Sequence, residues 1–352
     1  MRCSKTIVGS FDNKEIIAYN VKFENGFEVE ILNLGGVITK IITPDKDNNL
    51  ENILLAYEDV NDYIENPYYY GAIIGRTSGR ICEGKITIDN KPYELNKNYV
   101  LHQGHGGNKG FNKKIWEVYV EEHTNINEEK NYVTLILSTV SLDGEENYPG
   151  NLEVNVTFNI YEDYKIEEIY KAKSYETTLV NMTNHCYFNL SGNIKRPITE
   201  SYLKVDSEYI LELDNTCVPS GKLIKVENTP FDFSNLKLIG KHIDDNHEQI
   251  KIGNGYDHVF MLNKDKEIYM EDKESKRNMT IETNQESVVI YTSNWQHEKV
   301  AYTGRVPQLR HGICFETQAP PIGKDMCFME NSMLHKGEEY YQKTDYIFSV
   351  SE

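Results

Sequence analysis

The amino-acid sequence predicts an all-β protein, and three observations carry this prediction. Stretches that alternate apolar and polar residues recur along the chain, and glycine, proline, asparagine and aspartate separate them. Convincing helical periodicity is nearly absent. The 25 tyrosines favour strands, because aromatic side chains fit a pleated, half-buried surface. This pattern is typical of an antiparallel sandwich or barrel, and we expect one large domain over residues 1–352.

The expected strands follow one another from the N-terminus. The two clearest, at 132–140 and 152–161, flank the turn residues of 143–144 and 148–150, and they predict a hairpin with a long polar tip. A turn at 33–36 separates two earlier strands. Including these two, further strands are expected at 27–31, 37–42, 165–172, 202–206, 287–292 and 312–316. Short helical turns fit best at 60–63 and 233–238.

Composition excludes several classes of partner. The net charge of −18 argues against nucleic acid and anionic membranes, which need a basic footprint. No run approaches the ~18 apolar residues of a membrane helix. The six cysteines show no Cys-x-x-Cys spacing, and the N-terminus has no apolar leader segment. We therefore expect a cytoplasmic protein with reduced thiols, no bound metal and a neutral or small ligand.

The stretch from Asn181 to Gly192 holds the first candidate site. Period-2 alternation places His185, Tyr187 and Asn189 on one strand face, and Cys186, Phe188 and Leu190 on the other. An imidazole, a phenol and a carboxamide in a row are typical of a strand that lines a polar pocket. A strand whose outer face is simply hydrated fits this stretch equally well.

Glu316 is the second candidate, because it interrupts an otherwise apolar strand. Glutamate is rarely buried without a functional reason, since desolvation of a carboxylate is costly and raises its pKa. Asp257 precedes an apolar run and is either a turn former or an acceptor for hydroxyl groups.

Two loops add arginine and histidine candidates. Arg76 and Arg80 belong to Gly-Arg-Thr-Ser-Gly-Arg-Ile at 75–81, and a guanidinium fork suits a polar ligand, although surface ion pairs are commoner. His102 and His105 lie in a glycine-rich loop, where histidines are more often solvated than functional. Together, an acid, a base and several hydrogen-bonding groups suit proton transfer on a neutral polyol.

The chain resembles the aldose 1-epimerase (galactose mutarotase) family along nearly its whole length. The motifs that carry the resemblance lie in family order at 33–36 with 44–45, 75–81, 105–111 with 116, 143–144 with 148–150, 183–190, 219–221 with 229–232, 256–258, 291–292 and 315–318. The resemblance implies a large antiparallel β-sandwich with the sugar in an open cleft, and no cofactor. It implies an aldohexose such as galactose or glucose as the partner of a monomer or homodimer.

The resemblance also implies roles for individual residues. Glu316 would be the general base at the anomeric hydroxyl, and His185 the acid at the ring oxygen. We expect an apolar setting to raise the pKa of Glu316 toward neutrality, where His185 ordinarily titrates. Matched to the family pattern, the groups that hold sugar hydroxyls would be Arg80, His105, Tyr187 and Asp257. Arg76 is the weaker candidate of the two arginines.

Three positions depart from the family pattern. Gly79 replaces an asparagine, Val289 replaces a glutamine, and the Leu-His-Gly-Gly motif is split so that either His102 or His105 fits it. Spacing to the following phenylalanine favours His105. Two alternatives remain open: a hexose-6-phosphate 1-epimerase, which needs cationic groups for a dianion, and a non-catalytic carbohydrate-binding sandwich, which would not need both His185 and Glu316.

Overall fold

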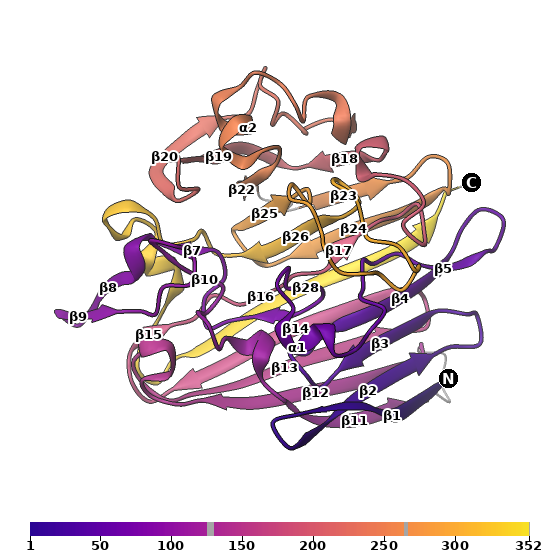
Figure 1. Ribbon diagram of the computed structural model, residues 1–352, viewed down its shortest axis with the longest axis horizontal. Helices are drawn as coiled ribbons and strands as arrows, with labels where there is room; N and C mark the ends of the chain where they lie inside the picture. The colour runs from indigo at the N-terminus through magenta and orange to yellow at the C-terminus, as the bar shows by residue number, and fades with distance from the viewer. Residues whose placement is uncertain (125–129, 264–266, 352) are drawn as a thin grey trace.

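A computed structural model describes residues 1–124, 130–263 and 267–351 of the chain, and it confirms the all-β prediction. Its main elements are antiparallel strands in large sheets (Figure 1). In these three segments the α-helices are two and short, α1 (Asp62–Glu65) and α2 (Glu248–Gly253). None of the described helices is long and apolar enough to span a membrane.

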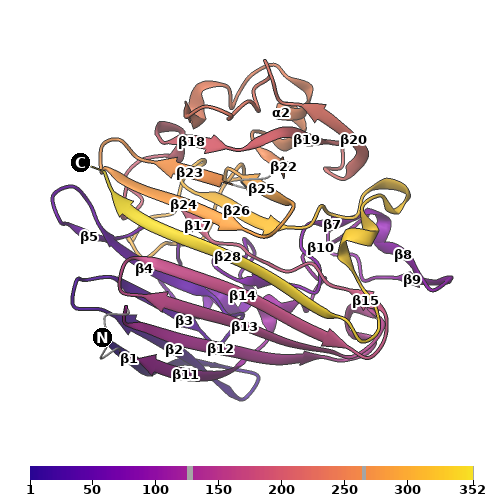
Figure 2. The ribbon, with the colours of Figure 1, turned by 180° about the vertical axis from the view of Figure 1, so that it is seen from behind.

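The largest sheet forms the layer that faces the viewer in Figure 2. Within the described residues it has nine strands, in the order β11 (Glu117–His123), β12 (Tyr132–Ser141), β13 (Leu152–Tyr161), β14 (Lys165–Ser174), β28 (Glu339–Val350), β24 (Arg277–Thr283), β23 (Glu267–Glu271), β18 (Tyr202–Val205) and β21 (Lys237–Leu238). Alternation is regular in β13, where every second residue is buried.

Two further sheets lie on the other side of this layer (Figure 1). One has the order β1 (Arg2–Phe11), β2 (Lys14–Lys22), β3 (Glu28–Leu32), β4 (Ile38–Pro44) and β5 (Leu50–Asn52). The other, which carries the site, has the order β17 (Tyr187–Phe188), β26 (Ile313–Gln318), β25 (Ser287–Tyr291), β22 (Asp257–Leu262), β19 (Ser207–Leu213) and β20 (Pro219–Lys225). We refer to these as the N-terminal sheet and the site sheet.

Short two-stranded pairs surround the site sheet. They are β7 (Arg80–Ile81) with β10 (Gln103–Gly104), β6 (Ile73–Ile74) with β16 (Thr183–Asn184), β8 (Lys85–Ile88) with β9 (Lys91–Glu94), and β15 (Thr178–Leu179) with β27 (Met333–Leu334). The first pair joins the arginine loop to the histidine loop, and the second joins two segments that are far apart in the sequence.

The main core lies between the layers. Buried side chains of β3, β12, β13 and β26, among them Val29, Leu135, Val156 and Phe315, belong to one apolar cluster. Complete burial of such a side chain contributes roughly 1.5–3 kcal/mol. Glu316 follows Phe315 directly, so its strand is held by this core on one face and turns its carboxylate to the other.

Most expected strands are present. The hairpin prediction is confirmed, because β12 and β13 pair residue by residue from Tyr132–Tyr161 to Ser141–Leu152. The strands expected at 27–31, 37–42, 165–172, 202–206, 287–292 and 312–316 correspond to β3, β4, β14, β18, β25 and β26, each within two residues at either end. The turn expected at 60–63 overlaps α1.

Two local predictions differ from the structure. The helical turn at 233–238 is wrong: residues 237–238 form β21, which pairs with β18, and the amide of Val205 donates to the carbonyl of Phe233. Backbone pairing with the sheet outcompetes a helical turn here. The continuous strand expected around His185 is two short strands, β16 and β17, and His185 lies in the break between them.

Candidate active site

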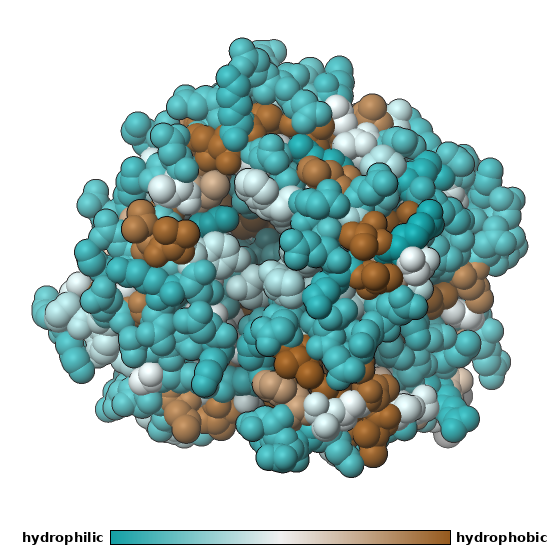
Figure 3. Space-filling model, in the orientation of Figure 1, coloured by the Kyte–Doolittle hydropathy of each residue, from teal (hydrophilic) through white to brown (hydrophobic). Residues whose placement is uncertain are grey.

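A pocket of about 290 Å³ opens on the face of the site sheet, and Figure 3 shows it as a hollow near the middle of that face. This volume is at the small end of the range of small-molecule sites, about 300–1,000 Å³. Its lining includes His185, Glu316 and four other residues expected from the sequence, which are Arg80, His105, Tyr187 and Asp257. The six come from five separate segments of the chain, since His185 and Tyr187 are two residues apart.

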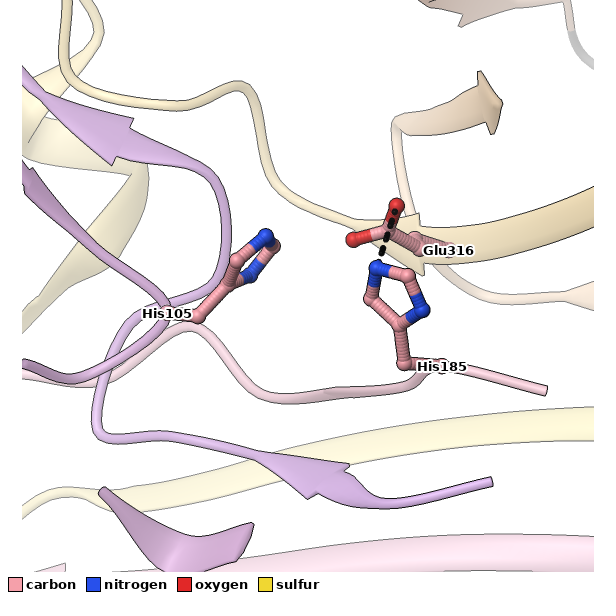
Figure 4. A group of neighbouring side chains, drawn as sticks. All are labelled: His105, His185 and Glu316. Carbon is pink, nitrogen blue, oxygen red and sulfur yellow. Dashed lines mark ion pairs between the residues drawn. The ribbon is translucent and has the colours of Figure 1, made fainter. Parts of the chain in front are cut away.

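His185 and Glu316 face each other in the pocket wall (Figure 4). Nε2 of His185 lies 3.5 Å from Oε1 of Glu316, and both residues are almost fully buried, at 4% and 3% exposure. Pairing of β17 with β26 brings the two segments together, because Tyr187 is opposite Cys314 in the register. Extended by two residues from Tyr187, the same antiparallel register sets position 185 opposite Glu316.

The surroundings of Glu316 favour its protonated form. Burial, and then the charge of Asp257, raise the pKa of Glu316 to about 8, although Arg80 opposes both. Val289 is its direct partner across β25 and β26, so an apolar side chain stands where the family has glutamine. Oε2 of Glu316 is buried without a hydrogen-bond partner among the described residues. The raised pKa expected from the sequence is present.

The titration of His185 differs from the sequence expectation of a pKa near neutrality. Burial lowers the pKa of His185 to about 4, and a hydrogen bond with its own backbone opposes this effect only in part. The sequence could not indicate this shift, because it depends on how completely the ring is covered by neighbours from other segments. The imidazole of the free site is therefore neutral at pH 7.

His105 reaches the pocket from the glycine-rich loop. The pairing of β7 with β10 sets Arg80 opposite Gly104, and the amide of His105 donates to the carbonyl of Gly79. His105 has φ of +49°, and Gly106 approaches Gly75 so closely that a Cβ would lie 1.8 Å from its carbonyl oxygen. Only glycine fits such a position. The rings of His105 and His185 are 5.3 Å apart.

His102, the other candidate of the loop, points elsewhere. It is buried outside the pocket lining, and its Nδ1 accepts a hydrogen bond from the amide of Glu83 at 3.0 Å. Nδ1 of His105, in contrast, is buried and has no partner in the described part of the chain. Burial, then the nearby His185 and Arg80, hold the pKa of His105 well below its usual range.

Arg80 and Asp257 form the charged side of the pocket. Their side chains lie 3.6 Å apart and are partly exposed. Burial alone would lower the pKa of Arg80, but Asp257 raises it above its ordinary value, so the guanidinium stays charged. It also lies over the ring of Tyr99 at 5.4 Å. The pair presents donors and acceptors side by side, which suits vicinal hydroxyl groups.

Tyr187 lines the pocket, whereas Asn189, which was expected on the same strand face, does not. The hydroxyl of Tyr187 donates to the carbonyl of Tyr68 at 3.0 Å. Asn189 instead donates to the carbonyls of Arg196 and His311 and belongs to a loop. The end of β17 at Phe188 explains this difference, since alternation holds only along a regular strand.

Arg76 lies outside the pocket and is 2% exposed. The five N–H groups of its guanidinium serve six acceptors, which are the hydroxyls of Ser141 and Thr178 and the backbone carbonyls of Ser141, Leu142, Pro149 and Gly150. Arg76 thereby fastens the connection between β12 and β13. These contacts are those of an arginine that holds the fold rather than a ligand.

Gly79, which replaces a family asparagine, has φ of +68°, and a Cβ there would lie 2.6 Å from Cγ of Pro321. Pro321 thus occupies the space that a side chain at position 79 would need. Together with Val259 and Val289, it gives this pocket an apolar edge.

The sequence did not identify several aromatic residues of the pocket. Tyr69, Tyr99, Tyr291 and Trp295 all line it, and Trp295 is 63% exposed. The ring of Tyr69 lies 4.8 Å from His105. The run of three tyrosines at 68–70 was the available signal, but composition alone does not tell a pocket wall from a core.

His105, His185 and Glu316 also have the donor types of a metal site. One ligand atom from each lies within 4.8 Å of the others. Two imidazoles and a carboxylate suit transition metals. The expectation that the site works without metal or cofactor remains a prediction.

Taken together, the pocket holds a carboxyl group with a raised pKa beside an imidazole with a lowered one, and buried unpartnered polar atoms that can bind hydroxyl groups. Such a pair can exchange a proton with each other and with two neighbouring oxygens of one ligand.

Comparison with known proteins decides the family. The family model described as aldose 1-epimerase matches residues 18–346. The chain belongs to the aldose 1-epimerase family. Aldose 1-epimerases are isomerases that interconvert the anomers of aldoses. The curated relatives include a galactose mutarotase from Sus scrofa, 32% identical over 92% of this chain and 91% of the relative.

Other members of the aldose 1-epimerase family agree with this assignment. An aldose 1-epimerase from Streptococcus thermophilus is 29% identical over 96% of this chain and 95% of its own. The crystal structure of a galactose 1-epimerase from Lactobacillus acidophilus NCFM superposes with a TM-score of 0.87 at 26% identity, and all of each chain is covered. The two proteins therefore share one fold.

Proposed function

We propose that this protein interconverts the α and β anomers of a free aldohexose such as galactose or glucose, with Glu316 as general base and His185 as general acid. The observation that carries the proposal is the 3.5 Å contact between His185 Nε2 and Glu316 Oε1 in the wall of the pocket. Around them, Arg80, His105 and Asp257 would hold the sugar hydroxyls, together with the hydroxyl of Tyr187.

The chemistry requires one proton to be shared by the pair. With a pKa of about 8 for Glu316 and about 4 for His185, the free site at neutral pH holds a neutral carboxyl and a neutral imidazole. Transfer of the carboxyl proton to Nε2 gives a carboxylate and an imidazolium without any proton from solvent. These two forms differ only in where that proton lies.

Ring opening then uses the ionised form. Glu316 removes the proton of the anomeric hydroxyl, and the C1–O1 bond of the sugar becomes the carbonyl of the aldehyde. The C1–O5 bond breaks, and the ring oxygen takes the Nε2 proton of His185. Rotation about C1–C2 and the reverse transfers close the ring on the other face. After opening, the pair is again a neutral carboxyl and a neutral imidazole, which is the stable form of the free site.

Charge favours a free hexose over a hexose phosphate. Among the described residues that line the pocket, Arg80 is the one lysine or arginine, and Asp257 already pairs with it. A phosphate dianion needs several cationic donors. A non-catalytic carbohydrate-binding role gives no reason to bury an imidazole against a carboxyl group, so it is not favoured.

We further propose that residues 1–352 form one domain, that the protein is cytoplasmic, and that it is a monomer or homodimer. One apolar cluster that includes residues of β2, β12 and β28 supports the single domain. All six cysteines carry free thiols, in keeping with a reducing compartment.

The proposed substrate is tested with freshly dissolved α-D-galactose, α-D-glucose and α-D-glucose 6-phosphate in a weakly catalytic buffer. The protein should accelerate the relaxation of the optical rotation of the two free hexoses in proportion to its concentration. It should accelerate the relaxation of the phosphate less. Acceleration of the phosphate alone would favour the 6-phosphate epimerase. No acceleration of any sugar would refute the proposed function.

A further inference from the structure

His185 has to keep one of its two ring protons throughout the reaction. In the proposed cycle Nε2 gains a proton from Glu316 and gives it to the sugar, so Nε2 is bare in the neutral ring. The remaining proton must then lie on Nδ1. The hydrogen bond that the other nitrogen makes decides which tautomer a histidine adopts. The partner of Nδ1 is therefore part of the site.

Cys314 lies against Nδ1. Its Sγ lies 3.6 Å from Nδ1 of His185, within the range for hydrogen bonds to sulfur, and the residue is fully buried at 0% exposure. Cys314 precedes Glu316 by two positions on β26, so both side chains leave the strand on the same face. One strand thus contacts both nitrogens of the imidazole, with sulfur at Nδ1 and carboxylate at Nε2.

We propose that Cys314 is a positioning residue whose sulfur accepts the Nδ1–H of His185 and so keeps Nε2 free to exchange its proton with Glu316 and the sugar. This inference rests on the proposed function, because it assigns a partner to the proposed acid. Nothing in the family motif quoted for this strand requires a thiol at position 314, since Phe315-Glu-Thr-Gln318 begins one residue later.

Sulfur suits this position because it is a weak acceptor. The ring oxygen of a sugar is a poor base, so its proton donor must be a strong acid. A carboxylate at Nδ1 would stabilise the imidazolium and weaken that acid. Burial, and then the charge of Glu316, raise the pKa of Cys314 well above its usual range, so the thiol stays neutral.

Among the described residues, Glu316 is the one carboxyl group in contact with the ring of His185. It lies at Nε2. The remaining neighbours are rings: His105, Tyr69, Tyr187 and Tyr291, with centroids 5.1–6.5 Å away. Burial keeps the tyrosines neutral by raising each pKa, and keeps His105 neutral by lowering its own. The backbone of His185 offers the competing acceptor.

The test compares Cys314→Ala and Cys314→Ser with Cys186→Ala. Cys186 is a matched control, because it is also a buried thiol, next to His185 in the chain, but it belongs to the main apolar cluster between the layers. Anomer exchange of galactose gives kcat and KM. Nitrogen-15 NMR of histidine-labelled protein without sugar gives the tautomer of His185.

In the wild type we expect the proton on Nδ1. Cys314→Ala should lower kcat by about 10- to 100-fold, which is the cost of removing the hydrogen-bond partner of a metal-bound histidine, with KM changed less than about twofold. The other tautomer of His185, with its proton on Nε2 and none on Nδ1, should become populated. Cys314→Ser, which retains an acceptor, should recover part of kcat, and Cys186→Ala should match the wild type.

Two results would overturn the inference. One is a Cys314→Ala protein with wild-type kcat and an unchanged tautomer, which would assign Nδ1 to the backbone. The other is an equal loss in Cys186→Ala, which would indicate general packing damage. If Cys314→Ala does not fold, the tautomer and kcat of Cys314→Ser decide. Either result leaves anomer exchange by the wild type intact, whereas an inactive wild type would refute the proposed function itself.

Discussion

The shared proton of Glu316 and His185 predicts how activity depends on pH. The productive pair carries one proton, and the free site carries one proton between pH about 4 and about 8. Above pH 8 the proton leaves Glu316, and kcat/KM should fall about tenfold for each pH unit. Below pH 4 a second proton binds, and kcat/KM should fall again. Ordinary pKa values would instead confine activity to pH about 4.3 to 6.5.

One neighbouring charge sets the pH at which kcat/KM falls on the alkaline side, which is the alkaline limb of the pH profile. The carboxylate of Asp257 raises the pKa of Glu316, so Asp257→Asn should shift this limb to lower pH, even though loss of a proposed sugar contact also lowers kcat/KM. Asp12→Asn is the matched control, because Asp12 lies exposed in the turn between β1 and β2 and carries the same charge. It should leave the limb in place.

The assay is the anomer exchange of α-D-galactose, followed by polarimetry between pH 3.5 and 9.5 with the enzyme-free rate subtracted at each pH. A limb near pH 6.5 in the wild type would refute the shifted pair. A shift of the limb to higher pH in Asp257→Asn would refute the electrostatic reasoning, because removal of a neighbouring negative charge can only favour ionisation of Glu316.

Three further predictions concern stability and metal. At pH 9, Glu316→Gln should raise the free energy of unfolding relative to the wild type, and at pH 5 it should not. A carboxyl whose pKa is raised by folding destabilises the protein as pH rises from about 4.5 to about 8. Equal differences in urea midpoints at both pH values would contradict this. Arg76→Met should cost about 3 kcal/mol or more, because it leaves buried carbonyls without donors; a loss below about 1 kcal/mol in the same measurement would contradict that role. Prolonged EDTA treatment should leave kcat unchanged, and a loss restored by Zn²⁺ would reveal a metal on His105, His185 and Glu316.

Sequence patterns predicted the regular parts of this fold well. Residues 132–140 and 152–161 alternate over long stretches, and such patterns survive in the structure because each strand is buried on one side. The segments at 233–238 and 185–189 were misjudged, because short elements take their form from neighbours distant in sequence. Pairing of β21 with β18 and the break before β17 are tertiary effects.

The site could be predicted by residue type but not by electrostatics. Glu316 was recognisable as a carboxylate inside an apolar strand, and a raised pKa followed from that alone. The lowered pKa of His185 and its contact with Cys314 could not be recognised from the sequence, because they arise where β16, β17 and β26 meet. Similarly, no local pattern distinguishes Arg76, which holds a hairpin, from Arg80, which lines the pocket.

The most direct test of the account compares the wild type with Glu316→Gln in galactose mutarotation by polarimetry, with galactose binding measured by calorimetry on both proteins. Loss of the base should lower kcat by about 10²- to 10⁴-fold while the dissociation constant of galactose changes little, since Arg80, His105 and Asp257 remain. An active Glu316→Gln protein would contradict the proposed acid–base pair. A wild type that binds galactose without accelerating mutarotation would contradict the proposed function.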